Sequence, residues 1–173
     1  FRWVADHIPL DAHAFLTDVT SAYAVLGLMG PMSRDLLSGV ADAELDNEAF
    51  PYLTSREINI GYATVRATRI TYVGELGWEL YVGTEFSTHV YDAIVSEGER
   101  LGLRHAGFHA MDSLRLEKGY RAWGHDMVEL DTSLEAGLGF AVLGVDLLVR
   151  NDRRNAATST TAVVGMALIA VFS

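Results

Sequence analysis

The stretch 69–81 places the strongest constraint on what this chain can fold into. It reads Arg-Ile-Thr-Tyr-Val-Gly-Glu-Leu-Gly-Trp-Glu-Leu-Tyr, with runs of β-branched and aromatic residues on either side of Gly74 and Gly77. Such residues favour strands, and glycine tolerates a positive φ or the close approach of another backbone. We therefore predict a hairpin with strands over 69–73 and 78–82.

The second strand of this hairpin has two chemically different faces. Side chains alternate along a strand, so Trp78, Leu80 and Val82 point one way while Glu79 and Tyr81 point the other. A carboxylate beside aromatic rings can accept two hydrogen bonds from a flat heterocycle that resembles an amide or a guanidine. Taken alone, the pattern more simply describes a Glu79 that faces solvent on a half-buried hairpin.

Helices and further strands surround this hairpin in the sequence. The apolar run 23–29 predicts a buried strand, and Pro31 is suited to the first turn of a helix after it. Helical spacing of apolar residues predicts a helix from Thr84, as its N-cap, to about Leu101, and a second helix over 108–120. Helices beside several antiparallel strands indicate an α+β fold, with antiparallel sheets and packed helices.

Three local features are also predicted. A short helix is expected over 11–17. The apolar side chains change parity near Thr68 and Arg69, which predicts a bulge or bend there. Asp112 and Arg115 are three residues apart on the second helix and can pair on its surface.

Composition excludes several functions. The formal net charge of −10 argues against nucleic acid and against an anionic membrane as partners. The chain has no cysteine, which excludes disulfides and thiolate metal sites and fits a reducing compartment, the cytoplasm or the mitochondrial matrix. His105 and His109 have a zinc-like spacing, but no third ligand and no glutamate base accompany them, so we predict no metal site.

Motifs in the same order along the chain resemble those of one family. The segment Tyr72-Val-Gly-Glu-Leu-Gly-Trp-Glu79 is similar to the Tyr-Thr-Gly-Glu-x-Gly-aromatic-Glu signature of the aminomethyltransferases. That family comprises the glycine-cleavage T-protein and the folate-binding domains of sarcosine and dimethylglycine dehydrogenases. Further resemblances cover AYAVLGLMGPMSRDLL (22–37), LRLEK (114–118), WGHDM (123–127) and SLEAGLGF (133–140). The resemblance extends from residue 1 to about residue 150, and we expect the chain to be a fragment of a longer protein.

The resemblance implies a ligand and residues that bind it. Tyr72 and Glu79 occupy the positions that hold the pterin ring of tetrahydrofolate in the family, Glu79 through the amino and imino nitrogens of the ring. Met111 stands where the T-protein has an arginine, and the dehydrogenase branch also has an apolar residue there. Arg115 and Glu117 match a family segment, and we expect both to be structural, pairing across the base of the helix.

A flavin-dependent parent follows from that branch of the family. FAD, bound by an upstream flavoprotein domain, would oxidise a small methylated amine, and tetrahydrofolate would take the one-carbon unit. The alternatives are a glycine-cleavage T-protein that uses a glycine-derived aminomethyl group, and a non-catalytic folate-binding module. The acid that steers transfer in the family lies upstream of the part that matches Phe1, so no catalytic residue is assigned and the isolated segment is expected to be inactive.

The same comparison suggests three regions. Residues 1–50 are expected to be the C-terminal part of one α+β subdomain, and 51–150 a second subdomain that carries the folate-type motif. Residues 151–173 begin with the polar run NDRRNAATSTT and are expected to be a linker or tail.

Overall fold

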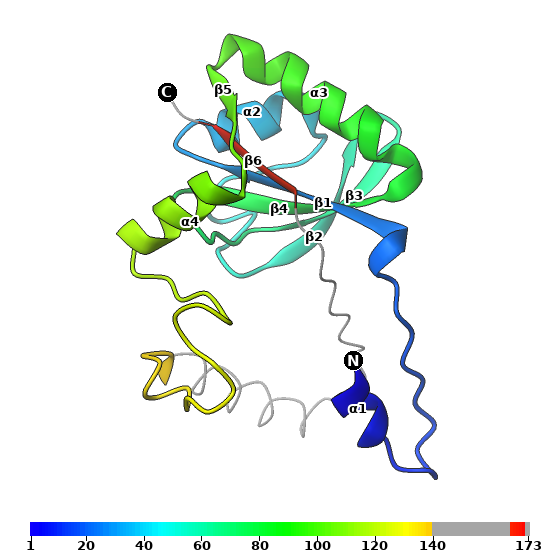
Figure 1. Ribbon diagram of the computed structural model, residues 1–173. Coiled ribbons are helices and arrows are strands. Elements are labelled where there is room, and N and C mark those ends of the chain that lie inside the picture. The colour runs from blue at the N-terminus through cyan, green and yellow to red at the C-terminus, as the bar shows by residue number, and fades with distance from the viewer. Residues whose placement is uncertain (140–166, 172–173) are drawn as a thin grey trace. The chain divides into compact units, whose positions relative to one another are not determined.

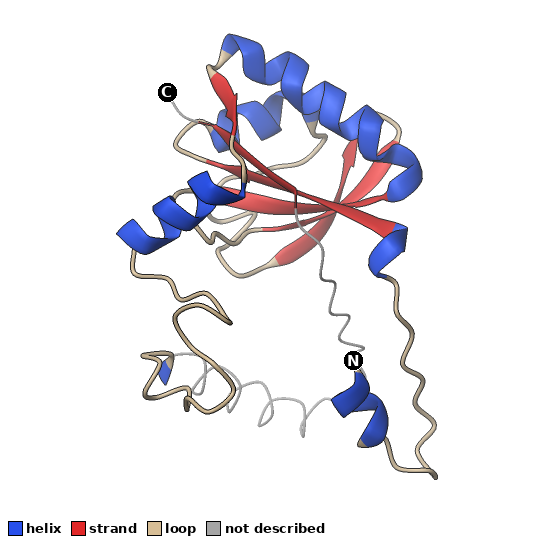
Figure 2. Cartoon of the chain, in the orientation of Figure 1, coloured by secondary structure: helices blue, strands red, loops and turns tan. Residues whose placement is uncertain are grey.

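The computed structural model describes residues 1–139 and 167–171, and the chain divides into two compact units (Figures 1 and 2). The first unit contains Phe1–Thr71, Glu75–Gly107 and Val163–Ser173, and the second contains Tyr72–Gly74 and Phe108–Ala162. Of the predicted linker or tail over 151–173, only 167–171 lie within the described residues.

One sheet forms the centre of the first unit. Its described strands, in the order in which they pair, are β2 (Ser55–Ile60), β3 (Ala63–Thr68), β4 (Gly77–Gly83), β1 (Tyr23–Met29), β6 (Ala167–Val171) and β5 (Leu103–His105). All neighbours pair antiparallel except β1 and β6, which are parallel. Together with its helices, this mostly antiparallel sheet confirms the predicted α+β class.

Two helices cover one face of that sheet, as Figure 1 shows for α2 (Ser33–Val40) and α3 (Ser87–Arg100). Their apolar residues join those of the strands in one core, because each element has a single apolar face that must leave water. The largest fully buried core side chains are Leu28, Leu36, Leu37, Phe50, Ile60, Val65, Trp78, Leu80, Val82 and Ile94. In the described residues, no helix is long and apolar enough to cross a membrane.

The central strand β1 matches its prediction residue for residue. It spans Tyr23–Met29, and its last five residues are buried. A strand with neighbours on both edges and an uninterrupted apolar sequence is buried on both faces, which is the reason the run could be recognised. After it, Gly30 N–H and Ser33 Oγ both donate to Leu76 O, at 2.8 and 3.0 Å. These bonds hold the segment that leads into β4 against the turn after β1.

The predicted hairpin is only half right. Residues 78–82 lie in β4 as expected, but 69–73 form no strand, because β3 already ends at Thr68. The end coincides with the predicted break near Thr68 and Arg69, and β3 and β4 pair directly, with Thr68 opposite Glu79. Residues 69–76 are therefore a connecting loop rather than the first arm of the hairpin.

Both glycines of that stretch have the roles expected of them. Gly74 has φ +76°, a left-handed conformation that side chains disfavour. At Gly77 a Cβ would stand 2.8 Å from Leu28 O and 2.8 Å from Met29 Cγ, so β1 approaches β4 closely there.

Two local predictions are wrong. Residues 11–17 are not helical; the helix of this region is α1 (Arg2–Asp6). Seven residues whose apolar side chains remain exposed lack the packing that a short helix requires. Thr84 does not cap α3, because its hydroxyl donates to Ser21 O at 2.9 Å. Instead, the chain enters α3 through a 3-10 turn, Thr84–Phe86.

The second unit contains one described helix, α4 (Phe108–Glu117). The helix stops short of the predicted end at residue 120, and Gly119, with φ +73°, reverses the chain after it. Beyond it, Trp123 and Met127 form an isolated bridge that spans the family-like segment WGHDM, residues 123–127. The part of the family-like segment beyond residue 139 lies outside the described residues.

Candidate functional site

Glu79 projects from the face of the sheet opposite α2 and α3. Its neighbours Trp78 and Leu80 are fully buried in the core shared with those helices, whereas Glu79 and Tyr81 are half-buried. The pleat of a strand produces this alternation, so the predicted division of side chains between the two faces is confirmed.

The two positions directly opposite Glu79 in the neighbouring strands carry small residues. Thr68 of β3 lies opposite Glu79 on one side, and Gly27 of β1 lies opposite it on the other. Thr68 donates its hydroxyl to Ser55 Oγ at 3.0 Å and so is engaged away from the carboxylate. Gly27 contributes no side chain opposite Glu79 on the β1 side.

Tyr81 holds one oxygen of this carboxylate. Its Oη donates to Glu79 Oε2 at 2.7 Å. Burial, and then the hydrogen bond and charge of Glu79, raise the pKa of Tyr81 to about 12, so the phenol stays protonated at neutral pH. Within the described residues, Glu79 Oε1 accepts no hydrogen bond.

This arrangement gives Glu79 a defined orientation and unused acceptor capacity. An ionised carboxylate has about four acceptor positions, and Tyr81 occupies one. A flat heterocycle with two adjacent N–H donors could therefore bind the remaining positions in a bidentate manner.

Tyr72 belongs to the second unit, whereas Glu79 belongs to the first. Its Oη donates to Arg121 O at 2.9 Å, and its ring stacks on Tyr120 with centroids 6.2 Å apart and planes inclined by 24°. Burial raises the pKa of Tyr72, partly opposed by the positive charge of Arg115. The Tyr72 hydroxyl is thus already hydrogen-bonded within the protein, so a ligand would contact the aromatic ring of Tyr72 rather than its hydroxyl.

The loop that receives the Tyr72 hydroxyl is anchored by Arg115. This side chain is only 3% exposed; its Nε donates to Asp112 Oδ1 at 2.7 Å and its Nη1 to Tyr120 O at 2.9 Å. Nη1 also contacts Asp126 Oδ2, which in turn accepts the backbone N–H of Ala122 at 2.9 Å. Burial lowers the pKa of Arg115, but hydrogen bonds to the two carboxylates outweigh it and leave that pKa raised.

These contacts correct two expectations about α4. The Asp112–Arg115 pair exists, but Arg115 is buried rather than on the helix surface. Arg115 does not pair with Glu117; its second carboxylate partner is Asp126. Sequence spacing finds a partner three residues away on a helix, whereas Asp126 is brought in by the turn at Gly119.

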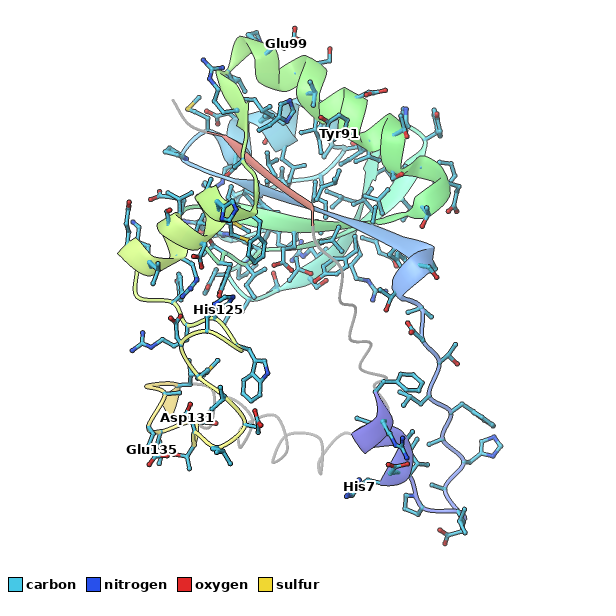
Figure 3. The ribbon with its side chains drawn as sticks, in the orientation of Figure 1. His7, Tyr91, Glu99, His125, Asp131 and Glu135 are labelled. Carbon is cyan, nitrogen blue, oxygen red and sulfur yellow. The ribbon has the colours of Figure 1, made fainter. Side chains whose placement is uncertain are left out.

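Sequence reasoning missed the partners of both predicted site residues. The sequence predicts that Tyr81 and Glu79 lie on the same face of the strand, but their hydrogen bond was not predicted. Their spacing of two residues was the signal that could have indicated it. No pattern identified Tyr120 as the ring that stacks on Tyr72. His125, labelled in Figure 3, precedes Asp126, whose carboxylate is committed to Arg115 and Ala122.

The two histidines with zinc-like spacing belong to different elements. His105 is in β5 and stacks on Tyr91 of α3, with centroids 6.0 Å apart, whereas His109 is in α4. Among the residues with described positions, no three His, Cys, Asp or Glu side chains are grouped to hold a metal ion.

Comparison with known proteins gives matches over most of the chain. The family model for the GCVT N-terminal domain matches residues 1–144. Mitochondrial sarcosine dehydrogenase of Mus musculus is 47% identical over 125 residues, which are 72% of this chain and 14% of that protein. The mitochondrial pyruvate dehydrogenase phosphatase regulatory subunit of Mus musculus is 40% identical over 138 residues, 79% of this chain and 16% of that protein.

An aminomethyltransferase of Halothermothrix orenii is 39% identical over 142 residues, 82% of this chain and 39% of that protein. The chain therefore spans well under half the length of these relatives. Two of the three relatives have the names of enzymes, and two are named as mitochondrial.

Proposed function

Because the chain belongs to the GCVT N-terminal domain family, as its motifs predicted, we propose that it is part of a tetrahydrofolate-binding domain. The parent would be a flavin-dependent dehydrogenase of the sarcosine or dimethylglycine type, which passes a one-carbon unit from a small methylated amine to tetrahydrofolate. FAD would be held by a separate flavoprotein domain. In a eukaryote, the mitochondrial names of two relatives favour the mitochondrial matrix.

The observation that carries this proposal is the geometry of Glu79. Its carboxylate is half-buried and oriented by Tyr81 at 2.7 Å, and its Oε1 is unengaged in the described part of the chain. The edge of a pterin presents an amino group beside a ring N–H, which is the donor pair that such a carboxylate can accept. Gly27, opposite Glu79 in β1, adds no side chain that would compete for the same space.

Tyr72 is proposed to flank the pterin with its ring. Its hydroxyl donates to Arg121 O, so hydrogen bonding to the ligand is not required of it. One face of the ring stacks on Tyr120, and the other can pack against a flat heterocycle. Arg115 and Asp126 support this position through Tyr120 O and Ala122 N.

The residues of this chain bind and orient the ligand. Tetrahydrofolate, when bound, supplies the nitrogens that accept the one-carbon unit. Glu79 is proposed to accept hydrogen bonds from the pterin, and Tyr81 remains a neutral donor because its pKa is about 12. None of these residues is proposed to transfer a proton to the substrate, so the catalytic acid or base stays unassigned.

The test is folate binding by the full-length parent, measured by isothermal titration calorimetry. Glu79→Gln keeps the shape of the side chain but replaces one acceptor oxygen by a donor. Since hydrogen bonds to charged groups are worth about 1.5–3 kcal/mol, we expect binding to weaken by about 10–100-fold. Glu99→Gln on α3, an exposed position labelled in Figure 3, removes a carboxylate elsewhere and should leave the affinity unchanged.

Two results would refute the assignment. One is a parent that binds no tetrahydrofolate; the other is a Glu79→Gln variant that binds as tightly as the Glu99→Gln control. Tyr72→Leu, which removes the aromatic face, should weaken binding more than Tyr72→Phe, which removes only the hydroxyl. The reverse order would assign Tyr72 a hydrogen-bonding role instead.

Two further functions would use the same proposed folate-binding residues. The relative from Halothermothrix orenii favours an aminomethyltransferase that takes its one-carbon unit from a glycine-derived aminomethyl group. The relative that is named as a regulatory subunit favours a module that transfers nothing. For such a module, folate binding is proposed on the geometry of Glu79 alone. Assays of the full-length parent separate the three functions. Turnover with a methylated amine indicates the dehydrogenase, turnover with an aminomethyl donor indicates the aminomethyltransferase, and folate binding without turnover indicates the non-catalytic module.

A further inference from the structure

Two arginines of the first unit converge on a single neutral oxygen. Arg34 Nη2 donates to Asn47 Oδ1 at 2.7 Å, and Arg69 Nη2 donates to the same oxygen at 2.8 Å. The three residues come from α2, from the loop after α2, and from the residue that follows β3. The fold therefore assembles this cluster from segments far apart in the sequence.

Arg69 is held firmly in this position. Its Nη1 donates to Phe50 O at 2.6 Å, and its guanidinium lies over the ring of Trp78, 5.8 Å from the centroid. Asn47 is exposed, whereas both arginines are half-buried. Asn47 is thus the most solvent-exposed member of the cluster.

In the described part of the chain, neither Arg34 nor Arg69 forms an ion pair. Asp46 is adjacent to Asn47, but its Oδ1 accepts the backbone N–H groups of Glu48 and Ala49 at 2.7 and 2.8 Å. These two hydrogen bonds are the main causes of its lowered pKa, and the positive charge of Arg34 contributes least. In a chain with a net charge of −10, two neighbouring guanidinium groups that form no ion pair with any described carboxylate require a reason.

Two further observations indicate that some N–H donors of Arg34 and Arg69 lack acceptors. Arg34 Nε is buried and has no hydrogen-bond partner among the residues whose positions are described. Burial, and then the positive charge of Arg34, lower the pKa of Arg69. Two neutral oxygens, Asn47 Oδ1 and Phe50 O, cannot satisfy two guanidinium groups, which together carry ten N–H donors and two charges.

We propose that Arg34 and Arg69 form a binding site for a small oxyanion, either a phosphate or a carboxylate group, with Asn47 at its entrance. Guanidinium groups match both oxyanions in shape and charge. This site is separate from the one proposed for folate. Arg69 lies over Trp78, which faces the helices, whereas Glu79 projects from the opposite face of the sheet.

The test uses the 173-residue chain with inorganic phosphate as the probe, and with acetate as a carboxylate probe, at constant ionic strength. The readouts are the melting temperature and the NMR shifts of the arginine Nε–H groups. We expect a saturable rise in melting temperature with phosphate, because a ligand that binds only the folded state stabilises it. Saturable shifts should appear at Arg34 and Arg69. A response to both probes defines a general oxyanion site, and a response to phosphate alone defines a phosphate site.

Substitutions distinguish this site from a structural clamp. Arg34→Gln should weaken phosphate binding about tenfold or more, whereas Arg66→Gln, an exposed arginine of β3, should not change it. Asn47→Asp places a carboxylate between the guanidinium groups. It should raise the melting temperature and abolish the response to phosphate.

Three outcomes would overturn the proposal. They are a wild-type chain without a saturable response, an Arg66→Gln variant as impaired as Arg34→Gln, and an Asn47→Asp variant that is less stable yet still binds phosphate. If Arg34→Gln does not fold, Asn47→Asp alone decides. The folate assignment is independent, since Glu79→Gln should leave the phosphate response intact.

Discussion

Replacing Tyr81 by phenylalanine tests the hydrogen bond on which the orientation of Glu79 depends. The phenol donates to Glu79 Oε2 at 2.7 Å, and its pKa is raised from 10.0 to about 12, by burial first and by Glu79 second. A pKa that is higher in the folded state means that the folded protein retains this proton more strongly. The resulting stabilisation is fully present below about pH 10 and is lost as the pH rises towards 12.

The size of the effect follows from those two values. A difference of 12 − 10.0 corresponds to at most ~2.7 kcal/mol of unfolding free energy. The side chain is half-buried rather than enclosed, so solvent screening reduces this, and we expect about 1 kcal/mol. The free-energy gap between the wild type and Tyr81→Phe should therefore narrow by about that amount as the pH rises from 10 to 12.

Two measurements on the 173-residue chain check this expectation. Urea unfolding between pH 10 and 12 gives the difference in unfolding free energy between the wild type and Tyr81→Phe. Near-ultraviolet absorbance of the phenolate shows whether one tyrosine with a raised pKa is missing from the titration of Tyr81→Phe. Glu79→Gln should lower the pKa of Tyr81 only in part, because burial remains the larger cause. Glu99→Gln should leave it unchanged. A gap that does not vary with pH, or a Tyr81 that ionises at its ordinary value, would refute the reasoning.

Two other predictions concern stability and pH. Gly77→Ala should lower the free energy of unfolding, measured in urea, by about 1–3 kcal/mol, because the new Cβ would stand 2.8 Å from Leu28 O. The control is Gly83→Ala in the same strand, where the Cβ meets only the flexible end of a glutamate; it should lower the free energy of unfolding by less than ~0.5 kcal/mol. Equal losses would contradict the close approach of β1. The pKa of Asp126 lies below its ordinary value, because the Ala122 N–H and then Arg115 stabilise the carboxylate. The Ala122 amide should therefore keep its NMR shift as the pH falls past about 3.9 and change only below it; a transition at or above that pH would contradict this.

Local sequence determined the features that depend on near neighbours. The bounds of β1 and the alternation of Trp78 and Glu79 in β4 follow from side-chain patterns within a few residues. The change of parity near Thr68, which predicted a bulge or bend, coincides with the end of β3. Strand pleating repeats every two residues and needs no distant partner to be expressed. The family motifs likewise could be recognised from residue order alone, and the match over residues 1–144 bears them out.

Predictions failed where a distant partner decides the conformation. The segment 69–73 has strand-forming residues, yet β4 pairs instead with β3 and β1, so no edge is left for it. Thr84 is a suitable N-cap, but Ser21 O takes its hydroxyl. The buried environment of Arg115 was also hidden, because a helical repeat reports spacing along one element and not what surrounds it.

The candidate sites divide in the same way. Residue order alone pointed to Glu79 and Tyr72, because each occupies a position in a recognisable motif. Only the tertiary structure brought Tyr81 Oη to the carboxylate of Glu79, and only it joined Arg34 and Arg69 at Asn47. Hydrogen bonds between side chains depend on distances of about 3 Å, and chain folding sets such distances between segments that the sequence leaves apart.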